Sequence, residues 1–388
     1  MVRSRRVLVC AGCGGVGKTT LAACFALGAA REGRRTLILT IDPARRLADA
    51  LGLEDLGGEP TPLPRPTLTR LGVPNDTALD ALMLDMKGTF DALVARLSDN
   101  PTARERILSN PIYQHISDAM AGSAEYSAME KVYEVFESGA YDLIVVDTPP
   151  SQHALDFFEA PARLLEFLDS SVVRLLIHPA MSAGRFGFRI FQRGAQRVLR
   201  LIERVSGVGF LEDLSNFLLA FEALSAGFRQ RVERARALFT GEHAACVLLA
   251  GPTAESARQA LQFLERLEEL ELPLCGIAAN RVRIWPGGGS PPAALLQPET
   301  PEQNELLARA LRTHFGENFP AEAAAAAAVA AAKRYAGMVR SDASALTPLR
   351  ERAEKRGWFW REIPELPRDI GDLDGLDALR HHLFGAER

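Results

Sequence analysis

Residues 12–19 read GCGGVGKT, and this stretch constrains the fold more than any other part of the chain. It fits the pattern G-x-x-x-x-G-K-[ST], directly follows the apolar run RVLVCAG (6–12), and opens a helical pattern over 18–33. A glycine loop between a strand and a helix lets backbone N–H groups and the helix N-terminus surround a phosphate group. The sequence therefore predicts an α/β fold with a phosphate-binding loop.

Each residue type in the loop suits contact with a nucleotide. Gly14, Gly15 and Gly17 let the backbone approach phosphate oxygens where a Cβ would collide. Lys18 supplies positive charge between the β- and γ-phosphates, and the Thr19 hydroxyl suits a Mg²⁺ ligand. The alternative is a glycine-rich turn that binds nothing. We assign nucleotide contacts to the whole loop: Gly12, Cys13, Gly14, Gly15, Val16, Gly17, Lys18, Thr19 and Thr20.

Further short apolar runs indicate the rest of the sheet. Most are nearly continuous, which is typical of parallel strands covered by helices on both faces. We expect one P-loop domain over 1–388, with a mostly parallel central sheet and helical insertions at about 86–138 and 155–240. The Gly/Pro-rich stretch 284–302 is expected to be a flexible loop. The runs beyond the first lie at 36–42, 79–85, 141–147, 245–251, 274–280 and 358–364.

The runs at 36–42 and 141–147 end in Asp42 and Asp147. In parallel α/β sheets the carboxyl ends of strands face the ligand, so Asp42 and Asp147 are candidates for the site. Asp147 follows four apolar residues and is expected to hold Mg²⁺ through water, together with Thr19. Asp42 is expected to orient the attacking water, which makes Lys18 and Asp42 the candidate catalytic residues. The alternative for each acid is a helix cap.

The end of a late strand indicates which nucleotide base is bound. A GTPase of this class would carry N-K-x-D there, but AANRVR stops at Asn280 without the aspartate. The sequence therefore favours ATP.

Composition narrows the class of protein. The 388 residues have a formal net charge of -4, which gives no general reason to expect a nucleic-acid partner. The N-terminal apolar run is too short for a signal peptide, and the alanine-rich stretch 322–335 favours a helix over lipid. The five cysteines are an odd number, and Cys10 and Cys13 have no second pair to complete a zinc site. We expect a cytoplasmic protein that is not an integral membrane protein and holds no zinc.

With these motifs the chain resembles the ArsA-type ATPases, which include arsenite-pump and tail-anchored-protein targeting ATPases. This family belongs to the same P-loop branch as MinD and the nitrogenase iron protein. Family members read K-G-G-V-G-K-T-T, D-P-A and D-T-A-P-T-G-H-T-L. This chain reads CGGVGKTT, DPARRLADALG (42–52) and DTPPSQHAL (147–155), with His153 in register. It is most similar to the paired bacterial members described broadly as anion-transporting ATPases.

The resemblance implies a dimer whose two nucleotide sites face each other, with hydrolysis moving helical subdomains between open and closed arrangements. It also implies that Asp42 activates water and that Asn280 contacts adenine. The stretch IPELPRD (363–369) would form the closing loop on the adenine side. We assign nucleotide contacts there to Pro364, Leu366 and Pro367.

Three departures from the family pattern bear on function. The chain has no cysteine between 25 and 245, where arsenite-pump ATPases bind the metalloid, and none over 281–388, where the targeting ATPases share zinc across the dimer. Cys13 stands where the family has a lysine that reaches the partner's phosphates. We therefore expect the chain to pair preferentially with a non-identical family member that retains this lysine.

Residues 164–221 leave three interpretations open. Apolar residues and arginines at near-helical intervals suit a packed subdomain with a solvated arginine face, an exposed groove for a client protein's helix, or a membrane-surface helix. For the whole chain, the main hypothesis is an ATPase that couples hydrolysis to conformational change on a client protein or membrane-linked partner. The alternatives are a regulatory or structural nucleotide-binding subunit with weak turnover and the energising subunit of an anion efflux pump.

Overall fold

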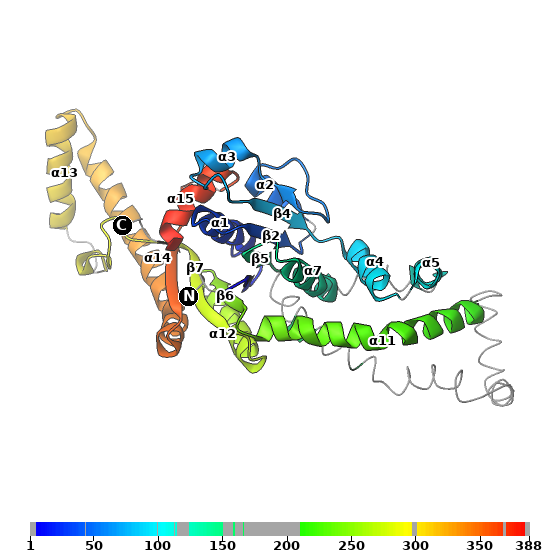
Figure 1. Ribbon diagram of the computed structural model, residues 1–388. Coiled ribbons are helices and arrows are strands. Elements are labelled where there is room, and N and C mark those ends of the chain that lie inside the picture. The colour runs from blue at the N-terminus through cyan, green and yellow to red at the C-terminus, as the bar shows by residue number, and fades with distance from the viewer. Residues whose placement is uncertain are drawn as a thin grey trace.

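The computed structural model describes residues 5–384 apart from 43, 99, 112, 115–123, 150–157, 160–165, 167–209, 297–300 and 368–369. Its centre is an eight-stranded sheet in the order β3-β4-β2-β5-β1-β6-β7-β8 (Figure 1). All neighbouring strands pair parallel except β3 and β4. The strands are β1 (Val7–Gly12), β2 (Thr36–Thr40), β3 (Thr61–Pro62), β4 (Leu79–Met83), β5 (Leu143–Asp147), β6 (Ala244–Ala250), β7 (Leu274–Val282) and β8 (Phe359–Pro364).

Helices cover both faces of this sheet. The helical elements in the described part of the chain are α1 (Lys18–Arg31), α2 (Arg46–Leu51), α3 (Arg65–Arg70), α4 (Met86–Leu97), α5 (Pro101–Leu108), α7 (Ala124–Ser138), α11 (Phe210–Thr240), α12 (Ala254–Glu269), the 3₁₀ helix η3 (Ala293–Leu296), α13 (Pro301–Phe315), α14 (Ala321–Arg356) and α15 (Leu373–Phe384).

The alternation of side chains along β1 divides the core into two layers. Val7, Val9 and Ala11 pack in the layer that contains buried residues of α7, α11, α12 and α14. Leu8 and Cys10 pack in the other layer, with buried residues of α1, α2, α3 and α15. A strand covered on both faces needs apolar residues at every position, which explains the continuous apolar runs in the sequence. The predicted α/β fold with a mostly parallel sheet is confirmed.

The strand order brings distant parts of the chain together at one edge. The connection from β1 through α1 to β2 passes over β5, which pairs with both strands. Asp147 at the end of β5 lies in register with Cys10 of β1 and with Thr40 of β2. The carboxyl ends of these three strands therefore meet beside the loop that follows β1.

The structure differs from the expected elements at several boundaries. β2 ends at Thr40, so Asp42 lies two residues beyond the strand. The antiparallel strand β3 has two residues, too few to produce a detectable period. In the stretch expected to be a loop, 284–302, η3 forms a short helical turn and α13 begins at Pro301.

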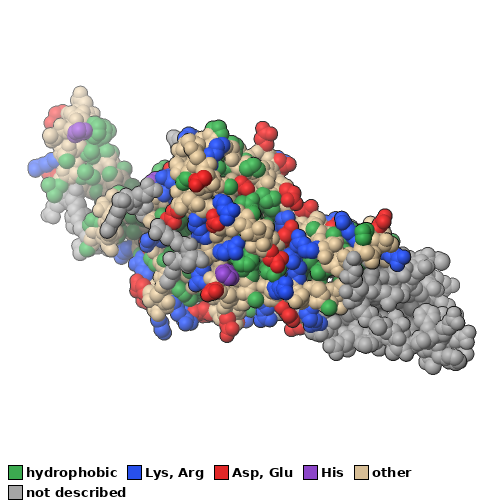
Figure 2. Space-filling model, in the orientation of Figure 1, with side chains coloured by type: hydrophobic (Ala, Val, Ile, Leu, Met, Phe, Trp, Pro, Cys, Tyr) green, Lys and Arg blue, Asp and Glu red, His purple; other side chains and the backbone are tan. Residues whose placement is uncertain are grey.

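Helices project from the sheet in two directions (Figure 1). On one side, α4, α5, α7 and α11 share a small core that includes Phe90, Tyr126 and Phe228. On the other side, α13 and the first part of α14 form a hairpin, and Leu306 and Phe315 of α13 are exposed. Figure 2 shows hydrophobic side chains on this hairpin and interspersed acidic and basic side chains over the central body.

Several sequence predictions fall outside the described residues. His153 and the arginine-bearing pattern at 188–205 are not described, and of 164–221 the described positions are residue 166 and 210–221 of α11. In the part of the chain that is described, no helix is both long enough and apolar enough to cross a membrane.

Candidate functional site

The loop between β1 and α1 forms an open helix N-terminus. Gly15 and Gly17 have φ angles of 77° and 87°, a left-handed conformation that a residue with a Cβ adopts at a cost. Gly17 caps α1 without any side-chain hydrogen bond, and the first turn of α1 contains no acidic residue. The first N–H groups of the helix and its positive dipole end therefore face the space above the loop, as anion binding requires.

Lys18 is held inside the loop. Its side chain is buried, and its Nζ donates a hydrogen bond of 2.9 Å to the carbonyl oxygen of Cys13. Burial lowers the pKa of Lys18, while the nearby carboxylate of Asp147 acts in the opposite direction. The ammonium group therefore lies beneath the loop with its hydrogen-bonding geometry already fixed.

Asp147 lies at the centre of a hydrogen-bonded group. The hydroxyls of Thr19 and Thr40 donate to its Oδ2 at 2.8 Å and 3.1 Å. Its Oδ1 is buried and has no hydrogen-bond partner. Burial raises the pKa of Asp147 to about 6, although both hydroxyls favour the ionised form.

This arrangement fits a magnesium ion. Mg²⁺ takes oxygen ligands and commonly keeps several waters, binding through one or two protein groups and the phosphates of a substrate. The Thr19 hydroxyl and the unpartnered Oδ1 of Asp147 are oxygen atoms of this kind at the base of the phosphate loop. A buried carboxylate oxygen without a partner is costly, and a hydrated cation would satisfy it.

Asp42 lies opposite the loop, at the start of the segment that leads to α2. Its Oδ1 accepts a hydrogen bond of 2.9 Å from the N–H of Ala44, and its own N–H donates to the Thr40 hydroxyl at 3.2 Å. Its Oδ2 lies 3.4 Å from Nη1 of Arg46. These contacts fix the carboxylate at the rim while leaving it partly exposed.

A cleft of about 340 Å³ joins these groups. The structure brings Gly15, Gly17, Lys18, Thr19, Thr20 and Asp42 together around it, as the sequence predicts. Asp147 lies beneath it, hydrogen-bonded to Thr19. Gly12, Cys13, Gly14 and Val16 belong to the loop but are not among the residues lining the cleft. The remaining lining residues are Arg46, Asp49, Ala50, Thr148, Arg281, Ile370 and Gly371.

A second hollow, also of about 340 Å³, adjoins the first and shares Gly17, Thr20, Arg281 and Ile370 with it. Asn280, Pro364 and Leu366 line it, which places three residues predicted for the adenine side together. Pro367 is not among its lining residues, which are completed by Glu365 and Leu379.

Asn280 also supports the loop itself. It is buried, and its Nδ2 donates to the carbonyl oxygen of Val16 at 2.9 Å. Because the amide nitrogen is engaged in this way, the orientation of Asn280 is set by the phosphate loop.

The Cys13 side chain packs in the core. It is 2% exposed and belongs to the same cluster as Cys10 and Leu21. All five cysteines of the chain are buried, and none forms a disulfide. Burial raises the pKa of Cys10, Cys24 and Cys246 and raises that of Cys275 to about 12, so these thiols stay protonated. Within the described residues, no three His, Cys, Asp or Glu side chains form a metal-binding group.

Thr40, Thr148, Arg46 and Arg281 are among the residues of the site that sequence reasoning missed. Thr40 holds Asp147, and the Thr148 hydroxyl donates to the Cys10 carbonyl at 2.9 Å. Thr148 directly follows Asp147, and Thr40 stands two residues before Asp42, so each lies close to a predicted acid in the sequence. Arg46 stands four residues after Asp42 and could have been found from this helical spacing. Arg281 has a φ angle of 60° where the pairing of β7 with β8 is irregular, and no sequence pattern predicts that conformation.

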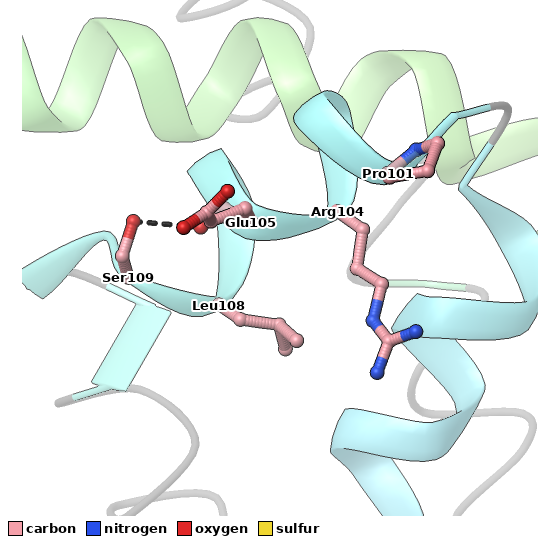
Figure 3. Close-up of a pocket in the computed structure, with 5 residues that line it drawn as sticks. All are labelled: Pro101, Arg104, Glu105, Leu108 and Ser109. Carbon is pink, nitrogen blue, oxygen red and sulfur yellow. Dashed lines mark hydrogen bonds between the residues drawn. The ribbon is translucent and has the colours of Figure 1, made fainter.

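A third hollow lies away from the phosphate loop. It measures about 360 Å³ and is open, on the surface of α5, with Pro101, Arg104, Glu105, Leu108 and Ser109 around it (Figure 3). The Ser109 hydroxyl donates to the backbone carbonyl of Glu105 at 2.6 Å. None of the residues predicted for nucleotide binding lines this hollow, so the site is assigned to the two adjoining hollows beside α1.

Comparison with known proteins identifies the family of this chain. The family model described as anion-transporting ATPase matches residues 5–205, more than half of the chain. The chain belongs to the anion-transporting ATPase family. This membership confirms the resemblance to ArsA-type ATPases, and the matched region contains the phosphate loop, Asp42 and Asp147.

Curated relatives match this anion-transporting ATPase family member over part of their own length. An arsenical pump-driving ATPase, so named, from Halobacterium salinarum is 31% identical over 168 residues, which are 43% of this chain and 26% of the relative. An ATPase get3 from Neurospora crassa is 30% identical over 162 residues, 42% of this chain and 44% of the relative. An ATPase ASNA1 homolog from Entamoeba dispar is 32% identical over 178 residues, which are 44% of this chain and 51% of the relative. The chain thus spans about half or less of the length of these relatives.

Proposed function

We propose that this chain is a Mg²⁺-dependent ATPase that hydrolyses ATP in the cleft between the phosphate loop and Asp42. The observation that carries the proposal is the contact between Thr19 and Asp147, 2.8 Å long, beneath a cleft lined by Lys18 and Asp42. The buried, unpartnered Oδ1 of Asp147 adds an oxygen atom suited to a hydrated cation. In a glycine turn that binds no ligand, this buried carboxylate oxygen would stay without a hydrogen-bond partner, which costs stability.

Each residue of the cleft has a proposed role in ATP hydrolysis. The backbone amides at the start of α1 and the Lys18 ammonium would hold the phosphates, and Thr19 and Asp147 would hold Mg²⁺, the latter through water. When bound, Mg²⁺ supplies charge neutralisation on the phosphates. Asp42 orients a water whose oxygen attacks the γ-phosphorus as the bond to the β,γ-bridging oxygen breaks. Asp42 takes up the water's proton and later releases it to solvent, and the products are ADP and inorganic phosphate.

Asn280 and the segment from Pro364 to Pro367 receive the adenine. Two features support this: the second hollow adjoins the phosphate cleft, and it is lined by Asn280, Pro364 and Leu366. Pro367 follows these residues in the same segment. We propose that Pro367 closes the site on the adenine side.

The activity is tested on the purified chain. ATP hydrolysis is measured for the wild type, Lys18→Ala and Asp42→Asn. Both substitutions should abolish turnover, because one removes the phosphate-binding cation and the other the group that orients water. ATP binding, measured by calorimetry, should survive better in Asp42→Asn. A wild-type chain that binds Mg·ATP without turning it over would instead support the regulatory subunit with weak turnover.

We further propose that the chain works as a dimer, preferentially with a non-identical family member that bears the signature lysine. The support is the buried Cys13 at the position where the family has that lysine. Hydrolysis is compared for the chain alone, for a mixture with such a family member, and for Cys13→Lys. Stimulation only in the mixture supports the asymmetric dimer, whereas strong activity alone that Cys13→Lys leaves unchanged contradicts it.

The client is proposed to be a protein, or a partner linked to a membrane, met in the cytoplasm. The printed name of one relative refers to arsenical pumping, but all five cysteines of this chain are buried. Partners that co-purify with Asp42→Asn in the presence of ATP would identify the client. Stimulation of ATP hydrolysis by arsenite would favour the pump-energising alternative.

A further inference from the structure

Arg46 lines the hollow beside the phosphate loop and does not line the hollow proposed for the base. The residues shared by the two hollows, among them Gly17 and Arg281, mark the junction between the phosphate part and the base part of the site. Arg46 and Asp42 line only the first hollow. A triphosphate that runs from the second hollow into the first therefore brings its terminal phosphate toward Arg46.

The present partner of Arg46 is easily exchanged. Its Nη1 lies 3.4 Å from Oδ2 of Asp42, and its side chain is 72% exposed. Exposed ion pairs of this kind contribute little to stability. A guanidinium forms shorter, bidentate hydrogen bonds with phosphate oxygens, so a γ-phosphate is a stronger partner than a carboxylate at this distance.

Arg46 is one of three cationic residues that line the cleft. The Nζ of Lys18 donates a hydrogen bond to the Cys13 carbonyl oxygen, and the Cys13 side chain packs in the core. Of the lining residues, Lys18, Arg46 and Arg281 carry positive charge, and Arg281 belongs to the junction. The guanidinium of Arg46 lowers the pKa of Lys18, which places both cations near the same space.

We propose that Arg46 is a catalytic arginine that the chain supplies to its own site, contacting the terminal phosphate of bound ATP. This contact rests on the proposed ATP hydrolysis. On binding, Arg46 exchanges Asp42 for the γ-phosphate oxygens, and its charge stabilises the negative charge that develops there in the transition state. The same movement releases the Asp42 carboxylate to orient the attacking water. Arg46 acts within one chain, so its effect is independent of any lysine that a partner provides.

The test uses the full chain alone, as wild type, Arg46→Ala and Arg46→Lys. The matched control is Arg45→Ala, because Arg45 is 70% exposed, pairs with Asp55 at 3.5 Å, and does not line the cleft. Steady-state hydrolysis gives kcat and KM, and calorimetry with Mg²⁺ gives the affinities for ATP and ADP. Thermal unfolding confirms that every variant is folded.

Arg46→Ala should lower kcat by about 100-fold or more, since arginines that contact the transferred phosphoryl group act on this scale or above it. The ratio of ATP affinity to ADP affinity should fall about tenfold, because ADP lacks the contacted phosphate. Arg46→Lys should recover part of both losses, and Arg45→Ala should lie within about twofold of the wild type.

An Arg46→Ala variant with wild-type kcat and an unchanged ratio of ATP to ADP affinity overturns the proposal. A wild-type chain that binds ATP but hydrolyses it neither alone nor in the mixture with a family member that bears the signature lysine overturns the proposed function instead. In that case the affinity ratio still decides whether Arg46 contacts the terminal phosphate.

Discussion

The side-chain amide of Asn280 donates a hydrogen bond of 2.9 Å to the carbonyl oxygen of Val16, joining β7 to a loop 264 residues earlier in the chain. A Cβ added to Gly17 would lie 2.5 Å from the same amide nitrogen. The phosphate loop is therefore fixed between its own left-handed turn and a side chain from a distant strand.

Gly17→Ala should destabilise the chain and greatly weaken ATP binding. The left-handed φ of 87° costs an alanine about 1–2 kcal/mol, and the contact with Asn280 adds a steric cost. Urea unfolding and calorimetric binding measure the two effects. The steric part can be isolated with Asn280→Ala in a double-mutant cycle, where the double variant should lose less stability than the sum of the single variants. Strict additivity would contradict a direct contact between these positions.

Asp147→Asn should separate stability from function. The carboxylate is buried with an unpartnered oxygen, so removing its charge should stabilise the ligand-free fold by about 1–3 kcal/mol at neutral pH. Mg²⁺-supported ATP binding should weaken at the same time. Urea unfolding without nucleotide and ATP titrations with and without Mg²⁺ measure the two effects. Thr40→Val serves as a comparison, because it removes one hydrogen bond to Asp147 but keeps the charge. If Asp147→Asn lowers stability, the carboxylate is structural.

The sequence predicted the central fold because strands covered on both faces leave continuous apolar runs, and a glycine loop between strand and helix leaves a fixed spacing. It also placed Asp42 and Asp147 near the loop, because parallel strands end at one edge. It could not predict that Thr40 would contact Asp147, since that depends on which strands are neighbours. The left-handed turn at Arg281 is an irregularity of pairing between β7 and β8. The inward position of Cys13 follows from packing, which its residue type alone does not determine.

Arg283→Ala should destabilise the connection between β7 and α14. Asp342 of α14 is buried and accepts hydrogen bonds from the backbone N–H and Nη1 of Arg283, at 3.0 Å and 2.9 Å. Removing the guanidinium leaves a buried carboxylate with one partner fewer, which should cost about 2–4 kcal/mol of unfolding free energy. Urea unfolding measures this loss. Arg309→Ala is the matched control: its exposed pair with Glu305, 3.9 Å apart, should contribute less than about 0.5 kcal/mol. Equal losses of unfolding free energy in both variants would mean that the Arg283–Asp342 pair contributes no more than an exposed ion pair.

Glu130 should make stability depend on pH. This residue of α7 is buried, bonded to Arg231 of α11 at 2.5 Å, and close to Arg96 of α4 and Glu134. Burial raises its pKa from 4.5 to about 7, although Arg231 and Arg96 oppose the shift. The folded chain thus keeps the proton in a range where the unfolded chain has lost it. The stabilisation from protonated Glu130 is complete below pH 4.5 and lost above about pH 7, a change on the order of 3 kcal/mol.

Urea unfolding of the wild type and of Glu130→Gln between pH 5 and pH 8 should measure this change, because glutamine does not titrate. The unfolding free energy of the wild type should fall relative to that of Glu130→Gln as the pH rises. Glu305→Gln, which removes an exposed carboxylate, should follow the wild-type profile. Parallel profiles for the wild type and Glu130→Gln would mean that Arg231 holds Glu130 ionised across the whole range.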